Sequence, residues 1–156
     1  IVPTKSADYF KNRYLKHPIY NYNIYGIYKE SSLQALIALR LISIKNTKVI
    51  RLVDFIGIEE DLANIASELQ NLLLLEKAEY IDLYFFGLDN KVLENGGFII
   101  RTKNSNTIIP NYFEPFVNSN VEINFAYRFM DIKDDRSIHL FKGDADQDRP
   151  NIILKN

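Results

Sequence analysis

Apolar and polar positions along the chain predict a mixture of helices and strands. The clearest pattern lies in residues 59–78, where apolar residues recur three and four positions apart, as on one face of an amphipathic helix. A shorter helix is predicted for residues 6–17, with Ser6 as its N-cap and Pro18 as its stop. Residues 88–95 predict another short helix, because two glycines follow them and one can take the left-handed capping conformation.

Between these helices lie runs of apolar, β-branched and aromatic residues, which are typical of strands. The polar sequences ESS and KNTK separate the first three runs, which predicts an antiparallel meander. The predicted strands are residues 20–29, 33–44, 49–57, 79–87, 97–102 and 121–129. This order of helix, three strands, long helix, strand, short helix and further strands predicts a mixed α+β fold.

Composition restricts the functional classes. Hydrophobic residues make up 47% of the 156 residues and the net charge is −1, so we expect one folded domain with no general attraction to nucleic acid. The absence of cysteine excludes disulfides, thiolate metal sites and a cysteine nucleophile.

The apolar runs are far shorter than the ~20 residues of a membrane span. With no signal-peptide pattern, we expect a cytoplasmic protein. Because the chain opens with Ile1, we expect it to be a fragment of a longer protein.

Asp54 is a candidate functional residue because it interrupts an apolar strand near its end. In a regular strand its side chain shares a face with Ile50, Leu52 and Ile56. Burial there would raise the pKa of the carboxyl group, and a nearby cation would lower it. Two interpretations are open. Asp54 is a general base or amine-binding group in a cleft, or it is paired with a basic side chain or with backbone N–H groups.

Near the end of the chain, the sequence GDADQDRP spaces three aspartates two apart, as an EF-hand calcium loop does. That loop needs glycine at its sixth position and glutamate at its twelfth, and Arg149 and Lys155 stand there. We therefore expect no metal site. Two other roles are open: a structural loop in which Arg149 pairs with an aspartate, or a loop that binds sugar hydroxyls or an ammonium group. The candidate substrate-binding residues are Asp144, Asp146, Asp148 and Arg149.

The order of elements resembles the second half of the GNAT N-acyltransferase fold. The matching pieces are VIRLVDFIG, the helix from Glu59, YIDLYFFG, LDNKVLEN and GGFIIR. The stretches DYFKNRYLKHPIYNYNIY and GDADQD also resemble segments of a bacterial GNAT-like group with two such domains, associated with surface-polysaccharide biosynthesis. The resemblance implies a single GNAT-like domain over residues 1–156, placed after an upstream GNAT-like domain. It further implies a three-layer arrangement with helices flanking a mixed, mostly antiparallel sheet.

The resemblance also implies a chemistry, in which an amine such as an amino sugar attacks the thioester of acyl-CoA. The thioester would lie along the splayed fourth and fifth strands. Asp54 would be the catalytic base, and the backbone at Phe55, Ile56 and Gly57 would bind the cofactor and stabilise the oxyanion.

One family motif is missing. Active members hold the pyrophosphate with a glycine-rich loop at a helix N-terminus, where this chain has GIEEDL. The three carboxylates of Glu59, Glu60 and Asp61 would repel a pyrophosphate. A second hypothesis is therefore a non-catalytic module that has lost the acyl-CoA loop and recognises a substrate or contacts a partner domain.

Overall fold

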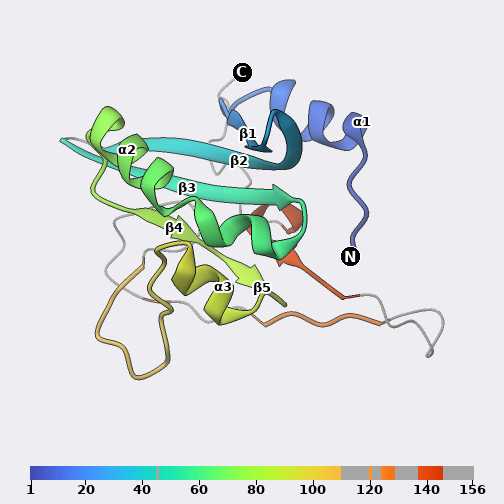
Figure 1. The fold of residues 1–156 in the computed structure, drawn as a ribbon. Coiled ribbons are helices and arrows are strands. Elements are labelled where there is room, and N and C mark those ends of the chain that lie inside the picture. The colour runs from blue at the N-terminus through green and yellow to red at the C-terminus, as the bar shows by residue number, and fades with distance from the viewer. Residues whose placement is uncertain (45, 110–119, 121–123, 129–136, 146–156) are drawn as a thin grey trace, which may run out of the picture.

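The computed structural model describes residues 1–44, 46–109, 120, 124–128 and 137–145 (Figure 1). Its main sheet has four strands in the order β1-β2-β3-β4, and a second sheet pairs β5 with β6. The strands are β1 (Asn23–Lys29), β2 (Ser32–Ile44), β3 (Thr47–Ile56), β4 (Ile81–Leu83), β5 (Phe85–Phe86) and β6 (Leu140–Phe141). None of the helices in these ranges is long and apolar enough to cross a membrane.

The first three strands form the predicted antiparallel meander. A two-residue turn joins β1 to β2, and both of its residues, Glu30 and Ser31, have positive φ angles of 48° and 69°. Such turns match the twist of a hairpin, although glycine or asparagine usually occupies them. β4 then joins β3 in parallel, so the sheet is mixed and mostly antiparallel, as predicted. The α+β class is confirmed.

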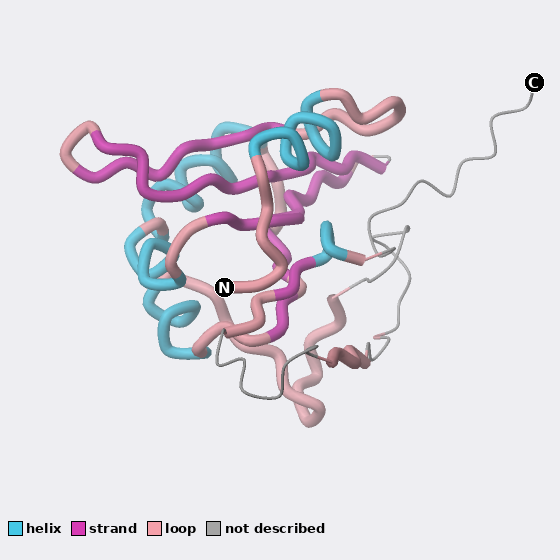
Figure 2. The backbone as a smooth tube through the Cα atoms, turned by 90° about the vertical axis from the view of Figure 1, so that its right-hand side faces the viewer, coloured by secondary structure: helices cyan, strands magenta, loops and turns pink. Residues whose placement is uncertain are grey.

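Helices cover both faces of the sheet, because alternate residues of β2 contribute to two different apolar clusters. On one face, Phe10 of α1 (Ala7–Phe10) and Tyr14 of η1 (Lys11–Leu15) pack with Ala38 of β2. On the other face, Ile37 and Leu39 pack with a second group of helices. These helices are η2 (Glu59–Asn64), α2 (Ala66–Glu76) and α3 (Asn90–Asn95), and Figures 1 and 2 show the arrangement.

The predicted long helix over residues 59–78 is two helices in the structure. η2 is a 3₁₀-helix, and Ile65, with φ −103° and ψ 7°, separates it from α2. Leu62 and Ile65 are both buried. A 3₁₀ turn places residues three apart on the same side, so the break lets both of them reach the core. The N-cap prediction is confirmed at Ser6, whose Oγ accepts a hydrogen bond of 3.1 Å from the N–H of Tyr9.

Lys77 ends α2 in the left-handed conformation, with φ 53° and ψ 43°. A non-glycine residue is strained there, so we expect Lys77→Gly to raise the free energy of unfolding by about 0.5–1 kcal/mol. Urea denaturation measures the change. Asn71→Gly, on the exposed part of the same helix, is the control and should lower the stability by about 0.2–0.4 kcal/mol, because asparagine is itself a poor helix former. Equal losses from both substitutions would contradict the capping argument.

Other sequence predictions need correction. The predicted strand over residues 79–87 is split into β4 and β5, and residues 97–102 form no strand. Phe98 and Ile100 pack against the core from an irregular segment, while Ile99 is 93% exposed. Phe98 and Ile100 thus pack against the core without the backbone hydrogen bonds of a strand. Residues 124–128 of the predicted last strand are also irregular, and residues 121–123 and 129 lie outside the described residues.

Candidate functional site

The strands β3 and β4 pair over only three residues each, Ile50–Leu52 with Ile81–Leu83, and then part. β3 continues to Ile56. The segment after β4 turns away through Tyr84 into β5, which pairs with β6. The segment that follows β6, η3 (Lys142–Asp144), lies against β3 beyond this point. The α-carbon of Gly143 is so close that an added Cβ would lie 3.2 Å from the carbonyl oxygen of Val53. The place where the strands part is therefore filled by the chain itself.

Asp54 lies at this place, but on the face opposite to the one predicted. The register of β2 with β3 shifts between Ala38 and Leu39, so that Val53 is an extra residue in β3. A β-bulge of this kind reverses the alternation of side chains beyond it. Leu52 packs on the α2 face, whereas Val53 and Asp54 face Tyr14 on the α1 side. The predicted grouping of Asp54 with Ile50 and Leu52 is wrong for this reason.

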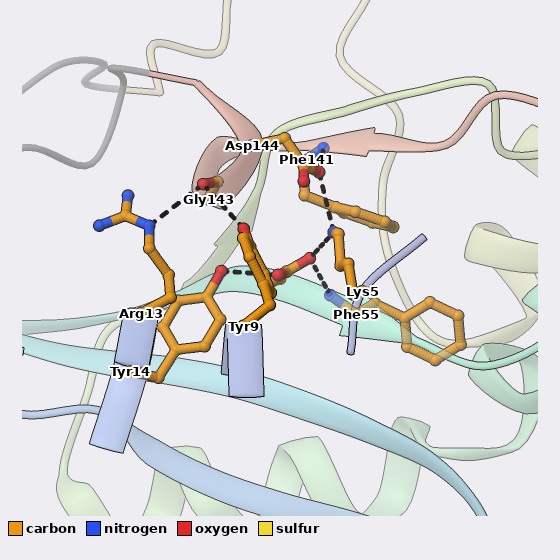
Figure 3. A network of polar contacts seen from close by, with 9 residues as sticks. Lys5, Tyr9, Arg13, Tyr14, Phe55, Phe141, Gly143 and Asp144 are labelled. Atoms are coloured by element: carbon orange, nitrogen blue, oxygen red, sulfur yellow. Dashed lines mark hydrogen bonds and ion pairs between the residues drawn. The ribbon is translucent and has the colours of Figure 1, made fainter. Parts of the chain in front are cut away.

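The carboxylate of Asp54 is fully buried and has three partners, Lys5, Tyr14 and Phe55, which are labelled in Figure 3. It forms an ion pair with Lys5, accepts a hydrogen bond of 2.6 Å from the hydroxyl of Tyr14, and accepts one of 2.8 Å from the N–H of Phe55. Both carboxylate oxygens are thereby engaged. These are the contacts of a carboxylate that is paired with a basic side chain and a backbone N–H group, the second of the two interpretations of Asp54.

Lys5 joins Asp54 to a second residue predicted from the sequence, Asp144. The Nζ of Lys5 lies 2.9 Å from Oδ2 of Asp144, and this oxygen also accepts the N–H of Phe141 at 2.8 Å. Nζ also lies 4.9 Å from the centre of the Phe141 ring. The side chains of Lys5 and Asp144 are only 5% and 7% exposed. We call Lys5, Asp54, Asp144 and Tyr14 the Lys5 network.

Two further side chains of the first helices hold the same segment. Arg13 donates from Nε to the carbonyl of Gly143 at 3.3 Å, and the hydroxyl of Tyr9 lies 3.5 Å from that carbonyl. The N-terminal segment is fixed at its other end too, because Val2 exchanges backbone hydrogen bonds with Ser137 and His139, at 2.9 and 3.0 Å. The first residues of the chain and residues 137–144 are therefore bonded to each other at several points, and Figure 3 shows the contacts of Lys5, Tyr9 and Arg13 with this segment.

Electrostatics in the Lys5 network follow from burial. Burial raises the pKa of Asp54, and the opposing influences of Lys5 and Tyr14 offset only part of that rise. Burial and the carboxylate of Asp54 also raise the pKa of Tyr14, so its hydroxyl stays protonated and remains a donor. A general base must reach the proton that it removes. Here the groups that reach the carboxylate of Asp54 are Lys5, the hydroxyl of Tyr14 and the N–H of Phe55.

The predicted cofactor-binding residues run along the end of β3. Phe55 and Ile56 pair with Ile37 and Leu36 of β2, and the N–H of Phe55 is directed to Asp54. A Cβ on Gly57, which has φ 155°, would lie 2.4 Å from Cβ of Ala35. Glycine at position 57 therefore lets the backbone pass close to Ala35 of β2. A role for these residues in holding acyl-CoA stays a prediction.

The acidic residues Glu59, Glu60 and Asp61 lie in η2 and not at the start of an α-helix, since α2 begins only at Ala66. Glu59 has a structural contact here, because its Oε2 accepts the N–H of Asp89 at 2.9 Å. Asp89 is the N-cap of α3 and accepts the N–H of Lys91 at 2.8 Å. Glu59 thereby links η2 to the start of α3.

A second buried ion pair, which sequence reasoning missed, joins Arg51 and Asp82 at 3.0 Å. Burial raises the pKa of Asp82, and Arg51 is the main influence that opposes this rise. A signal for this pair was present. Each is a charged residue within a mostly apolar run, and the two face one another in the parallel register. Lys5 carried no such signal, because it is an ordinary lysine 49 positions from Asp54.

The remaining candidates, Asp146, Asp148 and Arg149, lie outside the described residues, so of the four candidate substrate-binding residues only Asp144 is placed. Within the described ranges, no group of three His, Asp or Glu side chains is placed to hold a metal ion. Comparisons with protein-family models, with curated proteins and with solved structures find no match to this chain.

Proposed function

We propose that this chain is a GNAT-like domain that acts as a non-catalytic recognition or interface module. In catalytic GNAT enzymes the thioester lies along two splayed strands, and the corresponding strands here are β3 and β4. The observation that carries the proposal is that residues 141–144 and the Lys5 side chain occupy the place where these strands part. Acyl-CoA would have to displace a buried ion pair to lie there.

Three other features support this proposal. The N–H of Phe55, a candidate oxyanion donor, is already bonded to Asp54. Glu59 to Asp61 place negative charge where the family binds pyrophosphate, and Glu59 has its own backbone partner in Asp89. The placement of α1 and α2 on opposite faces of the sheet suits the three-layer arrangement of a GNAT-like domain.

The alternative is an active N-acyltransferase that transfers an acyl group from acyl-CoA to an amino sugar or similar amine. It is favoured by the position of Asp54, whose pKa is raised by burial at the point where the strands part. In that case Lys5 and residues 141–144 would have to leave β3 before substrate binds. Under the first proposal, a partner carries out the catalysis. The natural candidate is an upstream GNAT-like domain of the same protein, which would be a cytoplasmic bacterial protein associated with polysaccharide biosynthesis.

Calorimetric titration of the 156-residue chain with acetyl-CoA separates these proposals. We expect no saturable binding up to about 1 mM, the upper end of ordinary Michaelis constants. A matched variant, Glu60→Gln, removes one of the acidic charges at an exposed site and should leave this result unchanged. Saturable binding of acetyl-CoA that is lost in Asp54→Asn would contradict the proposal and support the acyltransferase.

A further inference from the structure

A cavity of about 660 Å³ borders β4, and no residue of the Lys5 network belongs to its wall. Its walls come from α2, from β4 and its flanking residues, and from the irregular segment after α3, the gold loop below β4 in Figure 1. Small-molecule sites generally have volumes of about 300–1,000 Å³ and walls that are mostly apolar. This cavity fits both criteria, and its apolar wall residues include Leu69, Leu73, Ile81, Leu83, Phe98 and Ile100.

The charges in the wall favour an uncharged ligand. Glu79 and Asp82 are acidic and Arg101 is basic, so the wall carries charges of both signs. Asp82 is moreover committed to Arg51 at 3.0 Å. A charged group placed among apolar side chains would also lose its hydration without gaining a dedicated partner.

Tyr80 gives the cavity a polar group. It belongs to the wall, and its buried hydroxyl has no hydrogen-bond partner within the described part of the chain. Burial, together with the carboxylate of Asp82, raises the pKa of Tyr80 to about 12, so the phenol is protonated at neutral pH. An unsatisfied buried hydroxyl is unfavourable, so a ligand oxygen that reaches it would gain a hydrogen bond.

We propose that this cavity binds a neutral, mainly apolar small molecule that carries one oxygen acceptor for the Tyr80 hydroxyl. The inference rests on the proposed function, because it names the class of ligand that a non-catalytic recognition module of this shape would take. The ligand would contact the wall formed by α2, β4 and residues 98–109, and the Lys5 network would take no part in binding.

Nile red is a suitable probe, because it is neutral and largely apolar and carries a carbonyl oxygen. We expect saturable binding of one dye per chain, seen as a rise and blue shift of its fluorescence. Decanol should displace the dye, whereas decanoate at pH 8 should need at least about tenfold more, since its charge meets Glu79 and Asp82. Unsaturable fluorescence would overturn the site, and equal displacement by both competitors would overturn the preference for a neutral ligand.

A matched pair of variants on α2 tests the location. Leu73 lines the cavity, whereas Leu75 is 76% exposed and does not belong to the wall. Leu73→Trp should fill the cavity and weaken Nile red binding by about tenfold or more, while Leu75→Trp should change it less than twofold. The chain has no natural tryptophan, so the emission of each new indole also reports its own environment. Equal effects of the two substitutions would overturn the location.

Tyr80→Phe tests the acceptor. Because the substitution removes an unsatisfied buried hydroxyl, we expect the melting temperature to rise by roughly 2–4 °C. The same change should weaken Nile red binding roughly three- to tenfold, the value of one hydrogen bond. Opposite effects on stability and binding distinguish a lost contact from damage to the fold. Unchanged dye affinity would overturn the role of the hydroxyl.

The dye experiment and the acetyl-CoA titration can fail separately. Acetyl-CoA binding with Nile red bound as expected would overturn only the proposed function. Absence of saturable dye binding together with absence of acetyl-CoA binding would overturn only the binding site inferred for this cavity.

Discussion

Replacing Lys5 by methionine should lower the free energy of unfolding by about 3–5 kcal/mol, as removal of one partner of a buried ion pair generally does. Lys5 is the cation between two carboxylates, Asp54 and Asp144, in a site that is nearly closed to solvent. Without it, both carboxylates are left close together in a poorly solvated place. Urea denaturation monitored by circular dichroism measures the loss.

Two controls separate charge from packing. Lys11→Met removes an exposed lysine nearby in sequence and should cost less than about 0.5 kcal/mol. In the Asp54→Asn background, Lys5→Met should cost at least about 1 kcal/mol less than in the natural chain, because residues in direct contact are coupled. A loss below about 1 kcal/mol for Lys5→Met alone would show that the network contributes little to stability.

Gly143→Ala should lower the stability by about 1–3 kcal/mol, the usual result of forcing an extra methyl group into a packed site. A Cβ at this position would lie 2.1 Å from the hydroxyl oxygen of Tyr14 and 3.2 Å from the carbonyl oxygen of Val53. The Tyr14 hydroxyl cannot simply move away, because it donates to Asp54 at 2.6 Å. Thermal unfolding of the variant measures the loss.

The Gly143 effect has a matched control in the β1–β2 hairpin. A Cβ on Gly26 would meet the ends of the Tyr28 and Leu33 side chains, which are 64% and 50% exposed and able to move. Gly26→Ala should therefore cost much less. In a Tyr14→Phe background, where the nearest obstructing atom is gone, Gly143→Ala should also become milder. An equal loss in both backgrounds would locate the strain elsewhere.

Local features of the sequence carried enough information for most helices and for the meander. The N-cap at Ser6 and the left-handed glycine after α3 depend only on neighbouring residues, and both are as predicted, with Gly97 at φ 86°. Strand pairing is different, because it depends on partners far along the chain. The apolar pattern of residues 97–102 is satisfied by packing alone, so the same pattern that predicted a strand belongs to an irregular segment.

The candidate site was predictable only in part. Asp54 and Asp144 stood out as carboxylates in unusual surroundings, and the structure places them around one ammonium group. The side of the sheet on which Asp54 lies was not predictable from alternation, because a bulge at Val53 changes the alternation just before it. Lys5 was missed because its position is decided by tertiary contacts with residues 49 and 139 positions away.

The long separation between Lys5 and Asp144 along the chain affects the order in which the protein folds. The contact between Lys5 and Asp144 spans 139 positions, so a ribosome that has made Lys5 must add nearly the whole domain before its second carboxylate exists. Contacts of such long range are also the slow ones, because a large loop must close before they form. We expect the helices and the meander to form first, and the first five residues to dock onto β3 as the final step of folding.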